Sequence, residues 1–101
     1  MHVIRVVIQV DPEAREKFVE IARHEFEQVP QQFEGCERFA YWDSIVNPGE
    51  VLLYQEWASV EDFDRYRGSD YFKQLGEKLF PLLAGKPDAA YYRAELAGDG
   101  D

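Results

Sequence analysis

Residues 54–72, YQEWASVEDFDRYRGSDYF, interleave six aromatic side chains with five acidic ones. Flat rings and tyrosine hydroxyls suit the wall of a cavity that binds a planar, partly polar ligand. The same side chains could also fill the core that a small domain needs. We expect both uses, with Phe63 and Phe72 mainly in the core. Three others are expected to border a cavity: Trp57, Tyr66 and Tyr71.

Arg38, Asp43 and Glu56 lie in predicted strands whose neighbours are aromatic. A guanidinium or carboxylate beside a buried cavity can stabilise an anion or titrate with a shifted pKa. Ion pairs at a sheet edge or an interface are the alternative, and alternation alone leaves open which face meets the helices. The alternation places four pairs of residues on common faces: Arg38 with Trp42, Tyr41 with Asp43, Tyr54 with Glu56, and Gln55 with Trp57.

No pattern of residues points to a bound metal or cofactor. His2 and His24 are 22 positions apart, and neither has a cysteine or carboxylate at a typical metal-ligand spacing. No glycine-rich loop leads from a strand into a helix, so a phosphate-binding motif is not present. Cys36, at the start of a strand, is expected to be a packing residue and not a nucleophile.

Hydrophobic periodicity and capping signals predict the elements that position these residues. A strand is expected over residues 3–10. Asp11 followed by Pro12 then starts a helix that runs to about Gln28 and is stopped by Pro30. The inward face of this helix is expected to carry Phe18, Ile21, Ala22, Phe26 and Val29, with the charges opposite.

A hairpin is predicted next. Residues 36–46 and 51–58 are rich in β-forming residues, and the turn between them contains Pro48-Gly49, which suits the central positions of a type II turn. We therefore expect these two strands to pair antiparallel.

Two helices and a last strand complete the predicted order. Ser59, with Asp62 three residues later, and Ser69 are expected to cap the helices, and Pro81 to kink or restart the chain just before it. Residues 89–96 form the final strand. The order β-α-β-β-α-β is the ferredoxin-like split unit, an α+β fold whose antiparallel sheet has helices on one face.

The sheet face away from the helices is expected to be half apolar, because Val3 and Val7 share it with Arg5 and Gln9. A partly apolar exposed face of this kind is often an interaction site. We therefore expect a homodimer formed through this open sheet face, with the two sheets face to face.

The composition limits the class of protein further. The 101 residues are expected to form one domain over 1–96, followed by a disordered acidic tail at 97–101. The net charge of −9 repels phosphate groups, so neither nucleic acid nor an anionic membrane is an expected partner. The N-terminus reads as a strand, no apolar run could span a bilayer, and Cys36 is the only cysteine. These features favour a cytoplasmic protein.

Residues 34–75, EGCERFAYWDSIVNPGEVLLYQEWASVEDFDRYRGSDYFKQL, resemble the antibiotic biosynthesis monooxygenase domain. That family's pattern runs from Pro-Gly-Cys into a strand, then through a polar hairpin to Tyr-x-Glu-Trp and a serine-capped helix. With the flanking strands the resemblance covers about residues 3–96. The matching positions are Gly35-Cys36, Tyr54, Glu56, Trp57, Ser59, Ser69 and Phe72.

The resemblance implies a dimeric α+β barrel and a monooxygenase that oxidises a quinol, a phenol or a polyketide-type aromatic compound with O2. In this chemistry neither metal nor flavin is used, because the deprotonated substrate itself supplies electrons to oxygen. The catalytic candidates are Tyr66, Tyr71, Glu56 and Arg38. The candidates for the wall of the substrate pocket are Trp57, Tyr54, Phe72, Phe63, Tyr41, Trp42 and Asp43.

The chain departs from the family pattern at two positions. Many members carry histidine where Tyr66 and Tyr71 stand, and an unperturbed tyrosine, with a pKa near 10, is a poor base at neutral pH. Tyrosine can still donate a hydrogen bond to an oxyanion. A non-catalytic dimeric binding protein, or an isomerase or cyclase on the same scaffold, therefore stays open as an alternative.

Haem is not an expected partner. The haem-degrading branch of the family uses an asparagine on the first strand, a tryptophan on the short helix and a histidine soon after the Phe72 position. Here the first strand has no asparagine, Tyr66 replaces the tryptophan, and Gly76 stands where the histidine would be.

Overall fold

The computed structural model describes residues 1–98 and 100 of the chain. The predicted tail at 97–101 therefore includes two residues, Asp99 and Asp101, that lie outside the described ones. The elements in chain order are β1 (His2–Gln9), the 3-10 turn η1 (Pro12–Ala14), α1 (Arg15–Gln32), β2 (Cys36–Asp43), β3 (Glu50–Trp57), α2 (Val60–Arg67), α3 (Asp70–Leu79), the 3-10 turn η2 (Phe80–Leu82) and β4 (Asp88–Arg93).

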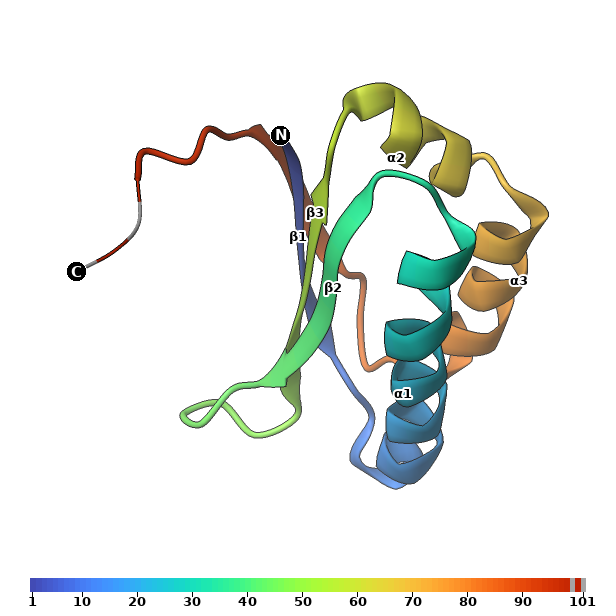
Figure 1. Cartoon of the computed structure of the whole chain (residues 1–101). Coiled ribbons are helices and arrows are strands. Elements are labelled where there is room, and N and C mark those ends of the chain that lie inside the picture. The colour runs from blue at the N-terminus through green and yellow to red at the C-terminus, as the bar shows by residue number, and fades with distance from the viewer. Residues whose placement is uncertain (99, 101) are drawn as a thin grey trace.

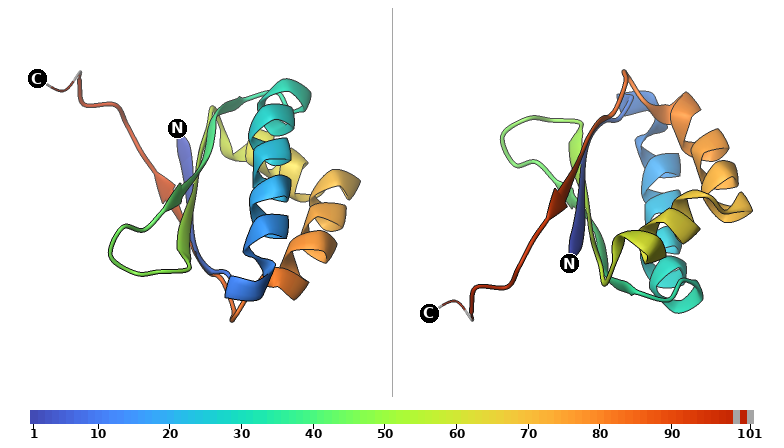
Figure 2. Two further views of the ribbon diagram at one scale, coloured as in Figure 1. Left: turned by 90° about the horizontal axis from the view of Figure 1, so that it is seen from below. Right: turned by 90° about the horizontal axis from the view of Figure 1, so that it is seen from above.

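The four strands form one antiparallel sheet in the order β2-β3-β1-β4. All three α-helices cover one face, while the β2–β3 loop and the C-terminal segment extend from the other side (Figure 1). The two further views show the same two layers (Figure 2). The predicted ferredoxin-like α+β fold is confirmed, whereas the barrel of two copies concerns a partner chain and stays a prediction.

The core lies between the sheet and the helices. On β3 the odd-numbered residues Val51, Leu53, Gln55 and Trp57 are buried, while the even-numbered ones between them face the open side of the sheet. On β1 the even-numbered Ile4 and Ile8 are opposite Gln55 and Val51 and join this core. Alternation thus assigns each strand one helix-facing and one open face.

The predicted caps and turn are confirmed. The side-chain oxygens of Ser59 and Ser69 accept hydrogen bonds from the backbone N–H groups of Asp62 (3.2 Å) and Phe72 (3.1 Å). Gly49 has φ +84°, as the third position of a type II turn requires. The chain restarts as η2 at Phe80–Leu82, where Pro81 was expected to interrupt the helix.

Pro30 does not end the first helix, which was the prediction, because α1 continues to Gln32. A proline removes only one backbone donor, and here it does so within one turn of the helix end. The N–H of Phe33 donates to the carbonyl of Val29 at 3.0 Å and closes the end, while the fully buried Val29 side chain holds the last turn on the core.

The second strand is also shorter than predicted. It ends at Asp43, and Ile45 and Val46, expected to be in the strand, are 100% and 76% exposed in the β2–β3 loop. β-Branched residues favour strands but do not form one without a partner chain to pair with. The final strand likewise ends at Arg93, before the predicted residue 96. Among the described residues no helix is long and apolar enough to cross a membrane.

Candidate functional site

The sheet divides the predicted site residues into two groups. Arg38, Trp42, Tyr54 and Glu56 lie on the open face, since Arg38 is opposite Glu56 and Trp42 is opposite Leu52 in the β2–β3 register. The aromatic residues of the other group lie in the layer between the sheet and the helices. These are Tyr41, Trp57, Phe63, Tyr66 and Tyr71.

The side chains of the open-face group contact and hydrogen-bond one another. The Tyr54 hydroxyl donates to Glu56 Oε2 at 2.6 Å, which raises the pKa of Tyr54. The Trp42 ring stacks on Tyr54 with 5.8 Å between centroids, and the Arg38 guanidinium lies 5.3 Å from the Trp42 ring centroid. The distances fit a cation–π contact and an aromatic stack on an accessible sheet surface.

Trp57, Phe63 and Tyr66 form the centre of the core. Their exposed fractions are 0%, 3% and 1%. The Trp57 indole N–H donates to Gln55 Oε1 at 2.8 Å, and the rings of Trp57 and Tyr66 stack at 5.2 Å. Burial raises the pKa of Tyr66, so its hydroxyl stays protonated at neutral pH. Phe72, which was expected to lie mainly in the core, is instead 36% exposed, because it projects from the first turn of α3, and its ring makes an edge contact with Tyr66.

A buried carboxylate lies next to this aromatic core. Glu25 of α1 is 4% exposed, and the Tyr71 hydroxyl of α3 donates a short hydrogen bond to its Oε2. Burial and this hydrogen bond raise the pKa of Tyr71. Among the described residues the other polar side chain at the Glu25 carboxylate is the exposed His24, whose Nδ1 is 3.5 Å from Oε1. A carboxylate in such surroundings is costly to bury unless hydrogen bonds compensate it.

Tyr41 brings a second buried polar group to the same layer. Its hydroxyl is shielded from solvent and has no hydrogen-bond partner among the described residues. The ring is held by edge contacts with Phe18 (5.8 Å) and Phe39 (5.7 Å). Burial and the nearby charge of Glu25 raise the pKa of Tyr41. A buried hydroxyl without a partner costs about 1–3 kcal/mol, which makes this group a candidate for a role in the site.

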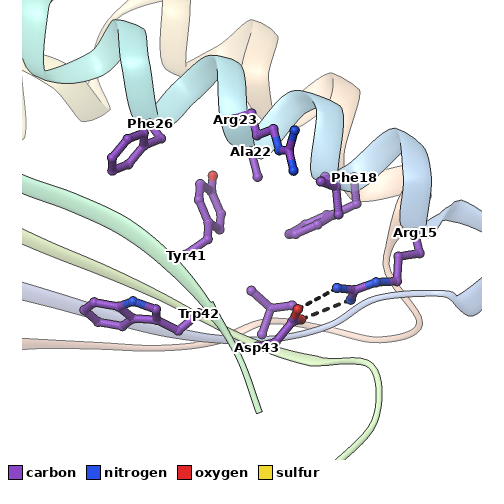
Figure 3. Close-up of a pocket in the computed structure, with 10 residues that line it drawn as sticks. Arg15, Phe18, Ala22, Arg23, Phe26, Tyr41, Trp42 and Asp43 are labelled. Carbon is purple, nitrogen blue, oxygen red and sulfur yellow. Dashed lines mark hydrogen bonds and ion pairs between the residues drawn. The ribbon is translucent and has the colours of Figure 1, made fainter. Parts of the chain in front are cut away.

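A groove of about 320 Å³ opens between α1 and β2 beside Tyr41. Figure 3 shows the Tyr41 ring between Phe26 and Ala22, with its hydroxyl toward α1. At one end of the groove Arg15 forms a bidentate ion pair with Asp43, in which Nη1 donates to Oδ1 at 3.0 Å and Nη2 to Oδ2 at 2.5 Å. We call this space the α1–β2 groove. Of the residues predicted for the pocket, Tyr41, Trp42 and Asp43 line it.

The sequence prediction missed Glu25. It placed the charges of the helix opposite the apolar face and put Phe26 inside, but Phe26 is 57% exposed and Glu25 is buried. The signal was available, since Phe18, Ala22, Glu25 and Val29 recur at helical spacing on one stripe. A single acidic residue within an apolar stripe marks a buried carboxylate.

Cys36 and the possible metal ligands were the remaining groups to place. Burial raises the pKa of the Cys36 thiol to about 11, so it is a neutral thiol at neutral pH. In residues 1–98 and 100, no three His, Cys, Asp or Glu side chains are grouped as metal ligands would be.

Comparison with known proteins places this geometry in a family. The family model described as antibiotic biosynthesis monooxygenase matches residues 1–78. No curated protein matches the chain.

Solved structures share the fold over nearly the whole chain. A presumed antibiotic biosynthesis monooxygenase from Deinococcus radiodurans has a TM-score of 0.89 and 17% identity and covers 100% of this chain and 99% of its own. One from Caulobacter crescentus CB15 has a TM-score of 0.89 and 23% identity, covering 94% and 90%. A conserved protein from Methanosarcina mazei Go1 is 28% identical with a TM-score of 0.82, covering 94% and 95%. From the family-model match, the chain belongs to the antibiotic biosynthesis monooxygenase family.

Proposed function

We propose that the protein is a monooxygenase that oxidises a small aromatic quinol, phenol or polyketide-type compound with O2 and without a metal or flavin. One observation carries this proposal. The Glu25–Tyr71 pair lies near the buried Tyr41 hydroxyl, which has no partner among the described residues, and Tyr41 lines the α1–β2 groove. Family membership supports the reaction class.

The buried pair supplies a path for the first proton. The Tyr71 hydroxyl already donates to Glu25, so its oxygen can accept a proton from a phenolic hydroxyl or, in an anthrone, from the methylene carbon, while its own proton passes to the carboxylate. Tyr71 thereby relays a proton without existing as a free phenolate, which its raised pKa disfavours. The Tyr41 hydroxyl then donates to the oxyanion that forms on the substrate.

The substrate anion supplies the electrons for the oxidation. It transfers an electron to O2, and the two radicals combine into a substrate hydroperoxide that loses water. For an anthrone, one molecule of substrate and one of O2 give one molecule of the quinone and one of water. One oxygen atom becomes the new ring carbonyl, the other leaves in the water with the two methylene hydrogens, and the methylene carbon is the group oxidised. No other reductant is needed.

The other candidates receive supporting roles in this proposal. Trp57, Phe63 and Tyr66 form the rigid wall behind the site, with Phe72 at its edge. Arg38, Tyr54 and Glu56 lie on the opposite face of the sheet, which separates them from Glu25. We assign them to the contact between two copies.

The contact between copies is the second part of the proposal. On the open face Val7, Leu52 and Trp42 lie side by side in the register of β1, β3 and β2, and Trp42 is 44% exposed. We propose that a second copy covers this face, sheet against sheet. Sedimentation velocity should give a dimer, and Leu52→Glu should shift it to a monomer, because a carboxylate at a buried apolar contact is unpaired. A wild type that stays monomeric at all concentrations would contradict the proposed contact between two copies.

The experiment for the reaction is turnover under oxygen-18 gas. Chelator-treated wild type is mixed with a panel of hydroquinones and anthrones, and oxygen uptake and label in the product are measured against a blank. One labelled oxygen atom in each product, formed faster than by autoxidation, supports the proposal. Conversion without oxygen instead indicates an isomerase or cyclase. A rise in melting temperature with no conversion indicates a binding protein.

A further inference from the structure

We propose that the α1–β2 groove selects planar aromatic anions, with the acidic group of the ligand held by Arg23. The inference rests on the proposed function only in taking this groove as the mouth of that site. It adds what the reaction class does not give, which is the charge of the molecule that enters.

The walls of the groove suit a flat ring. Phe18, Phe26 and Tyr41 present aromatic surfaces, and Ala22 and Val51 supply small apolar contacts between them. Phe26 is 57% exposed, a large apolar side chain that the core does not cover. A ring that slides against Phe26 would bury this surface, and aromatic contacts of this kind favour offset or edge geometry.

The charges of the groove favour an anion. Two guanidinium groups line it, and Arg15 is neutralised by its ion pair with Asp43. Arg23 makes no ion pair with any residue that the structure describes. Glu16 and Glu20 border a second depression along α1 together with Arg23, and they do not line the groove.

Among the described residues Arg23, Arg38 and Arg93 are the arginines without an ion pair, and of these three Arg23 lines the groove. A guanidinium fork available at the rim of an aromatic groove matches the two oxygens of a carboxylate. The ligand class that fits both features is an aromatic ring bearing a carboxylate or a similarly acidic oxygen.

The test compares two probes of the same shape. Isothermal titration calorimetry measures the binding of 2-naphthoate and of its neutral amide, 2-naphthamide, to the wild type and to Arg23→Gln. The wild type should bind the anion about tenfold more tightly or better, the range for a hydrogen bond to a charged group. Arg23→Gln should lose this preference and bind both probes alike.

Lys17→Gln is the matched control, because it removes one positive charge from the same helix outside the groove. It should keep the wild-type preference. Equal binding of the two probes by the wild type, an unchanged preference in Arg23→Gln, or no binding of either probe would each overturn the inference. Because no turnover is involved, these results are independent of oxygen uptake, and failure of the oxidation leaves them unaffected.

Discussion

The Tyr41 hydroxyl allows the site to be tested through stability as well as activity. If the buried hydroxyl has no hydrogen-bond partner until a ligand binds, removing it should make the ligand-free folded protein more stable. Tyr41→Phe deletes only this oxygen and leaves the ring contacts with Phe18 and Phe39 in place. Stability given up at a functional group is a recognised trade-off between stability and activity.

The expected size follows from the burial of the group. An unsatisfied buried hydroxyl costs about 1–3 kcal/mol, and we take the lower end because Tyr41 borders the groove. Tyr41→Phe should therefore raise the free energy of unfolding by about 1 kcal/mol. For a domain of this size that corresponds to a rise in Tm of about 4–8 °C.

The assay is urea unfolding followed by circular dichroism, with calorimetry for Tm, at one protein concentration because a dimer makes Tm depend on concentration. Tyr91→Phe is the control, since Tyr91 is 48% exposed and its change should stay within about 0.5 kcal/mol. A loss of about 1 kcal/mol or more in Tyr41→Phe would show that the hydroxyl has a partner and refute the reasoning.

Two further changes test the local structure. A Cβ on Gly35, which has φ +86°, would lie 2.2 Å from Asp62 Oδ2, so Gly35→Ala should lower the unfolding free energy by about 2 kcal/mol in urea titrations; an unchanged midpoint would contradict this. The hydrogen bonds from Arg15 hold the pKa of Asp43 below its usual value. The ion pair therefore stabilises the fold at pH values above the pKa of Asp43 in the unfolded chain, which is near 4. This stabilisation is lost as the pH falls through the lower pKa of Asp43 in the folded protein. Asp43→Asn should therefore cost less than about 1 kcal/mol at pH 7, because both side chains are about half exposed, and the difference should fade toward about pH 3 in unfolding curves. A difference that is constant with pH would exclude the ion pair as its cause.

Local signals in the sequence predicted most of the fold because each has a short-range cause. Ser59 and Ser69 cap helices through neighbouring N–H groups, and Gly49 accepts a positive φ. Pro30 misled the prediction because its effect depends on tertiary packing. The buried Val29 stabilises the last turn more than the missing donor weakens it.

The site was less predictable because it depends on which face of each strand meets the helices. Alternation paired Tyr54 with Glu56 and Gln55 with Trp57, as the hydrogen bonds of the structure have them. It could not say that Trp57 faces the helices, since strand neighbours of both parities are aromatic. The contact of Tyr71 with Glu25 joins residues 46 positions apart and follows from tertiary structure alone.

The proton path from the substrate through Tyr71 to Glu25 is the centre of this account. Its most direct test is kcat for anthrone oxidation by Glu25→Gln, measured by oxygen uptake beside the wild type and Glu27→Gln. Glu27 is an exposed glutamate on the same helix and serves as the matched control. The account predicts that Glu25→Gln loses about 100-fold or more in kcat, the usual share of a general base, while Glu27→Gln is unchanged. A folded Glu25→Gln protein with wild-type kcat would contradict it.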